Sequence, residues 1–323
     1  MKYRQLSVGL LAGAGMLLLI LDSNTAFHAA EEGVRLCINT VIPSIFPFLT
    51  LSIYMNQSLM GIRLPFLKPV AKIMRLPVGS ESILISAFLG GYPAGAQAVY
   101  QHYEAGSISK KTAEKLLAFT NNAGPSFIFG MISHMFTQKW VPWLIWSVHI
   151  ISAIYVSQII IISEDLTVPS AVKSGKATMD RALNATASIC GWVVLFKILS
   201  CFILKILPAD CPDSIQVLLT GILELSNGCL SLDAISSFPL RFMVCSLILA
   251  FGGICVTMQT SSVIKGLNMR YYFIGKIIQA IISIIVCAII IYGQWILFTP
   301  LFAALLFLRR NKNNCRNKEL IRV

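Results

Sequence analysis

Charged residues are scarce in this chain, and their scarcity excludes an ordinary soluble domain. Of the 323 residues, 12% are charged and 56% are hydrophobic, whereas a soluble globular domain has about 25% charged residues. The apolar residues gather in runs that are long enough to cross a bilayer as helices. We therefore predict an all-α, polytopic helical membrane protein whose surroundings are the lipid bilayer.

Motifs for catalysis and metal binding are also missing. The chain has no HExxH, no GxSxG, no P-loop and no pair of intramembrane aspartates, so it lacks the groups that metalloproteases, serine hydrolases, NTPases and aspartyl proteases require. Its nine cysteines include no CxxC pair, and most of them lie in apolar runs, where they are expected to pack as small residues. We expect no enzyme activity, no cofactor and no metal site.

Acidic residues are outnumbered by basic ones, which gives a net charge of +12. The lysines and arginines gather in short loops and in segment 309–323, as the positive-inside rule expects of cytoplasmic segments. This placement argues against nucleic acid as a partner, because a nucleic-acid binder needs its basic residues on one soluble face. Both termini are predicted to be cytoplasmic.

The apolar segments predict about eight crossings. They are 6–21, 36–55, 82–101, 140–162, 187–207, 239–258, 272–292 and 295–308. We interpret the first as a retained span, because Phe27 and His28 stand where a signal-peptide cleavage site would need small residues. Segment 22–35 is placed outside the membrane, and 56–81 is expected to hold an amphipathic helix at the interface. Segment 127–136 is expected to be a re-entrant half-helix or a limb of a hairpin, and 214–234 an amphipathic or re-entrant piece. His102 is expected to be solvated.

The stretch 86–126 lies among these spans yet carries residues that break helices. Glycines and prolines leave backbone groups without partners, and such backbone is tolerated at membrane depth only where it is buried in protein or lines a wet cavity. Helix 107–119 within it is expected to be capped by Ser109. The predicted solute-binding residues of this stretch are Gly90, Gly91, Tyr92, Pro93, Gly95, Gln97, Asn121, Asn122, Gly124 and Ser126.

The same residues have structural interpretations, which the sequence leaves open. Gly91 and Gly95 have the GxxxG spacing of close helix packing, although packing does not need Pro93 between them. The asparagine pair at 121–122 could either line a cavity or cap a half-helix. A buried Gln97 could equally bond a neighbouring helix.

A weak internal repeat relates this stretch to the second half of the chain. Gly90-Gly91 followed by Gln97 has a counterpart in Gly252-Gly253 followed by Gln259, so those three residues join the predicted site. In the predicted topology the two segments point in opposite directions, which is the inverted repeat that many secondary transporters use. Coincidence is the alternative, since glycine pairs are common in membrane helices.

This repeat divides the chain into five regions. They are a first span with an outer loop at 1–30, a first half-repeat at 31–163, a cytoplasmic linker at 164–186, a second half-repeat with a terminal hairpin at 187–308, and a basic cytoplasmic tail at 309–323.

Lys197 is the most prominent polar residue of the second half. It lies near the middle of the span 187–207, where a charge costs about 2.5 to 3.5 kcal/mol on insertion scales. It therefore needs a partner, and Glu224 is the nearest carboxylate in sequence. Contact with an anionic solute, a structural ion pair and snorkelling to the interface are the three interpretations.

Four stretches of the chain have the pattern of a known family: NTVIPSIFPF from Asn39, GYPAGA from Gly91, AEKLLAFTNNAGPSFIFG from Ala113, and Gly275-Lys276. Together they resemble the YlbJ family of sporulation integral membrane proteins, which belongs to the wider nucleoside-recognition, or Gate-domain, group. The match is strong over 31–130 and thinner over 187–280. Two departures are the neutral Gln97, where the family often has a lysine, and a short central linker at 163–180.

The resemblance implies a protein of the bacterial cell or forespore membrane that moves a small solute during spore maturation, with dipicolinate as the family-level candidate. A homo-oligomer or other sporulation membrane proteins are its candidate partners. We therefore expect a transporter driven by an ion or solute gradient or by consumption of the solute on one side, because no ATP-binding motif is present. The alternatives are a non-transporting assembly protein of the spore envelope and a nucleoside-type transporter or sensor.

Overall fold

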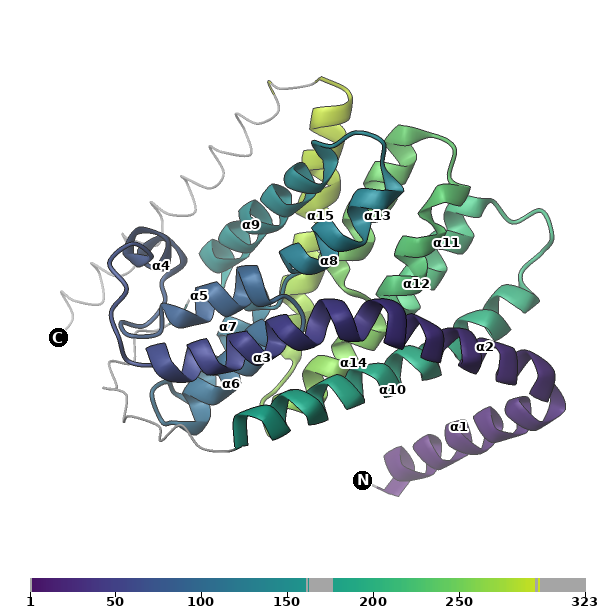
Figure 1. The fold of residues 1–323 in the computed structure, drawn as a ribbon, viewed down its shortest axis with the longest axis horizontal. Helices are drawn as coiled ribbons and strands as arrows, with labels where there is room; N and C mark the ends of the chain where they lie inside the picture. The colour runs from purple at the N-terminus through teal and green to yellow at the C-terminus, as the bar shows by residue number, and fades with distance from the viewer. Residues whose placement is uncertain (1, 161, 163–176, 294–295, 297–323) are drawn as a thin grey trace.

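The computed structural model describes residues 2–160, 162, 177–293 and 296, and every regular element within them is a helix (Figure 1). Five of the described helical segments are long and apolar enough to cross a membrane. They are Ser23–Leu59, Val141–Ile159, Met179–Ile206, Phe238–Val263 and Arg270–Ile291. The expectation of an all-α membrane protein is confirmed. The predicted crossing at 295–308 and the tail at 309–323 lie outside the described residues, apart from residue 296.

Segment 22–35, which was predicted to lie outside the membrane, is helical and continuous with the span that follows it. Helix α1 (Lys2–Leu21) is followed almost at once by α2 (Ser23–Leu36), a π-turn (Cys37–Val41) and α3 (Ile42–Leu59). Asp22 starts the second run, because its carboxylate accepts a hydrogen bond from the Thr25 amide (3.3 Å). The segment that was expected to lie outside is therefore part of one long, bent helix.

Helix α10 (Ala177–Ile206) runs antiparallel to α2 and α3 (Figure 1). Lys205 near the end of α10 contacts Asp22 at the start of α2 (2.5 Å), whereas the Cys190 carbonyl accepts a hydrogen bond from Cys37. Gly33 permits this close approach, since a Cβ atom there would lie 3.0 Å from the Val194 Cα.

The segment 82–101, predicted as a broken crossing, is instead one leg and part of the other of a helical hairpin. After the short α4 (Lys68–Met74) come α5 (Ser82–Ile85), a π-turn (Ser86–Gly90) and α6 (Ala94–Glu104). The two ends of the hairpin meet, because the Ser82 hydroxyl lies 3.1 Å from His102 Nε2. His102 is thus buried rather than solvated.

A broken helix follows the hairpin. Helix α7 (Lys110–Thr120) ends at the extended segment 121–124, and α8 (Pro125–Gly130) begins directly after it. The predicted cap is confirmed, since the Ser109 hydroxyl accepts a hydrogen bond from the Thr112 amide (3.2 Å). A 3₁₀ turn (Ile132–Met135) and the long α9 (Val141–Ile159) complete the first half.

The second half repeats this order. After α10 come α11 (Asp213–Leu223) and α12 (Leu225–Leu230), which form a second hairpin and are followed by a 3₁₀ turn (Ser231–Ala234). A second broken helix follows, made of α13 (Phe238–Phe251) and α14 (Gly253–Val263), and then the long α15 (Arg270–Ile291). Each half thus contains a long helix, a hairpin, a broken helix and another long helix.

This order changes the register of the repeat that the sequence suggests. By position in the fold, the break at Gly252-Gly253 corresponds to the break at 121–124, and the turn at Gly91 corresponds to the turn at Glu224. The glycine pairs at 90–91 and 252–253 therefore belong to different kinds of element. The two halves are packed together by a hydrophobic cluster to which both contribute, with Phe127 from the first and Phe242 from the second.

Candidate functional site

The four interruptions of the helices meet near the centre of the molecule. A Cβ atom on Gly91 would lie 2.9 Å from the Gly124 Cα, so the first hairpin turn contacts the first broken helix. A Cβ on Gly252 would lie 3.5 Å from the Tyr92 ring, and one on Gly253 would lie 3.0 Å from the Gly221 carbonyl oxygen. A side chain at Gly91 would clash with the Gly124 backbone, and Gly252 and Gly253 both have positive φ angles that favour glycine. The prediction that the broken elements lie together agrees with this geometry.

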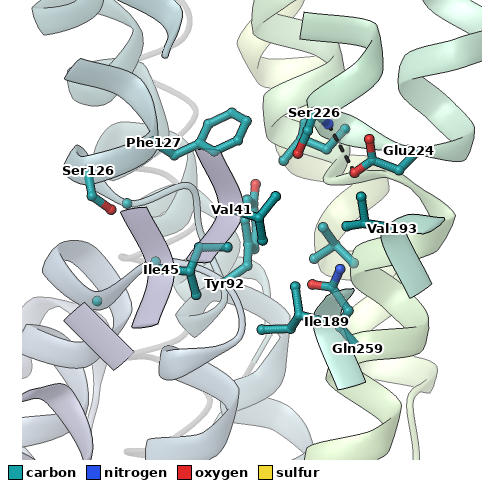
Figure 2. A pocket seen from close by; sticks show the side chains of 15 residues that line it. Val41, Ile45, Tyr92, Ser126, Phe127, Ile189, Val193, Glu224, Ser226 and Gln259 are labelled. Atoms are coloured by element: carbon teal, nitrogen blue, oxygen red, sulfur yellow. Dashed lines mark hydrogen bonds between the residues drawn. The ribbon is translucent and has the colours of Figure 1, made fainter. Parts of the chain in front are cut away.

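A cavity lies at this meeting point, between the two halves (Figure 2). It encloses about 460 Å³ of space not filled by atoms, counting the part that opens outward. Six residues of the predicted site line it: Gly90, Gly91, Tyr92, Gly124, Ser126 and Gln259. The other lining residues are Val41, Ile45, Phe127, Ile189, Val193, Glu224, Leu225, Ser226 and Val256. A mainly apolar wall with a few polar groups is typical of a small-molecule site.

Glu224 is the one charged side chain among the residues that line the cavity. It is buried, and its carboxylate accepts hydrogen bonds from the amides of Ser226 (3.1 Å) and Asn227 (2.7 Å) at the start of α12. The turn of the second hairpin thus presents a carboxylate to the cavity. From the sequence, Glu224 was considered only as a partner for Lys197. Its place in a half-polar segment between apolar spans could have indicated a site residue.

The polar groups face the cavity from different elements. Figure 2 shows Glu224 and Ser226 at one end and Gln259 at the other, with Val41, Ile45 and Tyr92 across from them. The Tyr92 hydroxyl is fixed, because it donates to the Leu249 carbonyl oxygen at the end of α13. The Gln259 amide nitrogen lies 3.1 Å from Cys255 Sγ, which is a weak acceptor, so this side chain keeps most of its capacity for hydrogen bonding.

Lys276 on α15 lies next to this cavity and was not among the predicted site residues. It is 1% exposed, and its ammonium donates to the Asn121 carbonyl oxygen and to Gln279 Oε1 (3.0 Å). The ammonium nitrogen also lies 5.1 Å from the centre of the Tyr92 ring, within range of a cation–π contact. The cation therefore contacts the break after α7 and a residue that lines the cavity.

The asparagine pair after α7 bonds to the second half. Asn121 Nδ2 donates to Thr260 Oγ1 (2.8 Å), and Asn122 Oδ1 accepts from Gln279 Nε2 (2.8 Å). Asn122 also donates to the Phe119 carbonyl oxygen (2.9 Å). Asn121 thus connects the break after α7 to α14, and Asn122 connects it to α15, whereas the residues that line the cavity include neither of them.

The remaining predicted residues of the first hairpin serve its packing. Pro93 precedes the first turn of α6, and a Cβ on Gly95 would lie 1.7 Å from the Thr120 carbonyl oxygen. Gln97 is buried, and its Oε1 has no hydrogen-bond partner among the described residues. For Gly95 the geometry supports the interpretation as a close helix contact.

Lys197 lies away from this centre. Its ammonium contacts the carboxylate of Glu32 on α2 (2.9 Å), and the side chains are 21% and 64% exposed. Glu224, the partner that sequence proximity suggested, instead caps α12. Lys197 thus lies on the outer face between α2 and α10. Of the three interpretations, the ion pair is the one that the structure shows, with Glu32 as the partner in place of Glu224.

The described part of the chain offers no cluster of three or more histidine, cysteine or acidic side chains that could hold a metal ion. A search among curated proteins finds a similar protein, the sporulation integral membrane protein YlbJ of Bacillus subtilis (strain 168). The two are 23% identical over 326 residues, which cover 84% of this chain and 79% of that protein. The two proteins are homologous. No protein-family model matches the chain, and no solved structure matches it either.

The YlbJ homology confirms the resemblance that the motifs suggested. The dipeptide Gly275-Lys276 was one of the four stretches on which the resemblance rested, so it could have indicated Lys276 as a candidate site residue. Gly275 lets α15 approach α7 closely, since a Cβ there would lie 2.0 Å from the Ala118 carbonyl oxygen. That contact brings the next residue, Lys276, to the break at 121–124.

Proposed function

We propose that this YlbJ homologue is a transporter for a small solute, with dipicolinate as the leading candidate, in the cell or forespore membrane of a spore-forming bacterium. The observation that carries the proposal is the cavity at the junction of four interrupted helical elements, between two halves with the same element order. Such interruptions are costly in hydrocarbon and are tolerated where they are buried in protein or line a water-filled cavity, and in secondary transporters they form the solute site.

The arrangement of the halves supports alternating access. The long helices α2–α3 and α10 occupy equivalent places in the two halves and run antiparallel. A cavity between halves of opposite direction can open to either side when one half rocks against the other. Energy for accumulation would come from an ion or solute gradient, because the sequence contains no nucleotide-binding motif. The basic loops favour cytoplasmic termini.

Dipicolinate as the solute draws support from the positive groups at the site. The Lys276 ammonium contacts the Tyr92 ring on the edge of the cavity. The α6 and α14 helices also begin at the breaks, and the N-terminus of a helix carries a partial positive charge. These groups favour a carboxylate on the solute.

A nucleoside-type solute is the second candidate, and Glu224 is the observation that favours it. A buried carboxylate in the wall repels an anion but accepts hydrogen bonds from the hydroxyl groups of a neutral solute. The amide of Gln259 at the other end of the cavity can bond either kind of solute.

Uptake by purified protein in liposomes tests the proposal. We expect labelled dipicolinate to enter proteoliposomes faster than protein-free liposomes, and faster than a labelled nucleoside does. The Gln259→Ala variant should lower uptake by about tenfold, the equivalent of about 1.4 kcal/mol, whereas Met258→Ala, at a neighbouring exposed position of α14, should not.

Each alternative predicts a different result in the same experiment. An assembly protein of the spore envelope would transport neither solute and would be unaffected by Gln259→Ala. A sensor would bind solute in detergent without moving it across liposomes. Faster entry of the nucleoside would replace dipicolinate with the second candidate.

A further inference from the structure

The bonding of Lys276 is unusual for a cation inside a membrane protein. Its side chain is buried, and no carboxylate among the described residues lies within ion-pair distance of it. Two neutral oxygens hold it instead, the Asn121 carbonyl and Gln279 Oε1. A buried charge with no opposite charge is costly, so the position needs a reason beyond packing.

The number of partners suggests that reason. An ammonium has three N–H donors, and the structure gives Lys276 two acceptors within the described part of the chain. A neutral amine has two N–H donors and could keep both bonds. The rings of Tyr92 and Tyr272 lie 5.1 and 5.9 Å from the nitrogen and stabilise the charged form by cation–π contact. The site can therefore accommodate both forms of the side chain.

We infer that Lys276 carries the exchangeable proton that couples solute movement to a proton gradient. The inference rests on the proposed transport function and identifies its driving ion. In the charged form, Lys276 holds a positive charge beside Tyr92, which lines the cavity. An acidic solute in the cavity stabilises that charge, and because coupling is reciprocal, the proton in turn strengthens solute binding.

The proton step needs only water as co-reactant. One N–H bond of the ammonium breaks, the proton passes to a water molecule on the side to which the cavity is open, and the electron pair stays on the nitrogen. The amine keeps its bonds to the Asn121 and Gln279 oxygens. A proton from water on the other side restores the ammonium before the next solute binds.

Titratable side chains approach Lys276 from several of the neighbouring elements. Tyr92 approaches from the first hairpin turn, Tyr272 lies one turn earlier on α15, and His149 on α9 is the nearest titratable group of that helix. Helix α7 offers its C-terminal carbonyl at Asn121, while its Glu114 lies farther along and bonds the Asn268 amide.

Helix α13 completes the surroundings of Lys276. It contacts α15 through Ser246, which meets Ser283 and Cys287 beyond Lys276, and its Arg241 pairs with Asp233. His149 is therefore the neighbour that an experiment has to distinguish from Lys276.

Two assays in proteoliposomes with labelled dipicolinate test the inference. Exchange of external label for internal unlabelled solute at equal pH needs no change in protonation, whereas net uptake does. A gradient of one pH unit can drive about tenfold accumulation per coupled proton, and for the wild type we expect at least about threefold more net uptake with the outside acidic, after subtraction of protein-free liposomes.

Variants of Lys276 should separate exchange from gradient-driven uptake. Lys276→Met should weaken exchange, because it removes the positive charge that favours the solute, and the exchange that remains should not respond to a pH gradient. Lys276→Arg, whose guanidinium does not release a proton in proteins, should keep exchange and lose net uptake. Lys197→Met is the matched control, because that lysine lies in the outer ion pair, and it should behave like the wild type in both assays.

Several outcomes would overturn the inference. They are a wild-type gradient response in Lys276→Met, normal gradient-driven uptake by Lys276→Arg, and loss of the response in His149→Gln with its retention in Lys276→Met. If the Lys276→Met protein cannot be reconstituted into liposomes, the result for Lys276→Arg alone supports or overturns the inference.

Absence of exchange by the wild type would instead count against dipicolinate transport. The inference is then tested without solute, by nitrogen NMR of protein labelled at lysine. The signal missing from Lys276→Arg should change with bulk pH across the physiological range, and a constant signal would contradict proton exchange at this site.

Discussion

Two of the lysines that lie within apolar helices of the second half, Lys197 and Lys276, have opposite surroundings. Lys197 reaches the outer face between α2 and α10 and contacts an exposed carboxylate, Glu32. Lys276 points into the junction of the breaks and bonds neutral oxygens. In the sequence, both lysines lie within apolar segments where a charge is costly. The structure shows that the surroundings of each charge depend on the face of the helix that carries it, and not on its position along the apolar segment.

The neighbouring glycines show the same contrast. In the centre, Gly95 and Gly275 lie directly against carbonyl oxygens of α7. On the outer helix α10, a Cβ atom on Gly191 would meet nothing within 4 Å. The central region is therefore built from backbone contacts that leave no room, whereas position 191 on the outer helix has space for a side chain.

Replacement of glycine by alanine should give the largest difference between the two regions. In Gly95→Ala the added methyl group would need to lie 1.7 Å from the Thr120 carbonyl oxygen, so the first hairpin must move off α7. We expect a loss of stability of about 3 kcal/mol or more and little folded protein by size-exclusion chromatography and thermal unfolding in detergent. Gly191→Ala should leave both measurements unchanged. A stable Gly95→Ala protein would contradict the packing described for the centre.

The two carboxylates that accompany the lysines provide the next comparison. Glu224 lines the cavity, whereas Glu32 lies on the outer face. If the solute is an anion, Glu224→Gln removes a repulsive charge, and we expect binding of labelled dipicolinate to strengthen by about tenfold, or about 1.4 kcal/mol. Glu32→Gln should have no effect on binding. Weaker binding in Glu224→Gln, together with loss of nucleoside binding, would favour the nucleoside-type solute.

Much of the central region could be predicted because its signals are local. Glycine and proline clusters such as 90–95 and 124–125 interrupt helices wherever they occur, and the cap at Ser109 depends on residues within one turn. Interrupted backbone needs protein or water around it at membrane depth, which is why six residues chosen from the sequence lie on one cavity.

What was missed depends on tertiary contacts. Segment 22–35 was placed outside because of its acidic residues, and neither its helix nor the burial of Ala26, Ala29 and Gly33 was predicted. Segment 82–101 is long enough to cross, and no local signal distinguishes a crossing from a hairpin. Lys276 lies in the predicted span 272–292 and was not chosen as a site residue, because only the tertiary contact of Gly275 brings that turn of α15 against α7.

The outer ion pair should give the smallest effect of those compared here. A double-mutant cycle with Lys197→Gln and Glu32→Gln, measured by thermal unfolding in detergent, should give a coupling energy of about 0.2 to 1 kcal/mol. The value is small because both side chains reach the surface and lose conformational entropy when they form the ion pair. The same cycle should leave dipicolinate binding unchanged. A coupling above about 2 kcal/mol, or a change in binding, would show that the outer face is connected to the centre, and the contrast between the two lysines would then no longer separate structure from function.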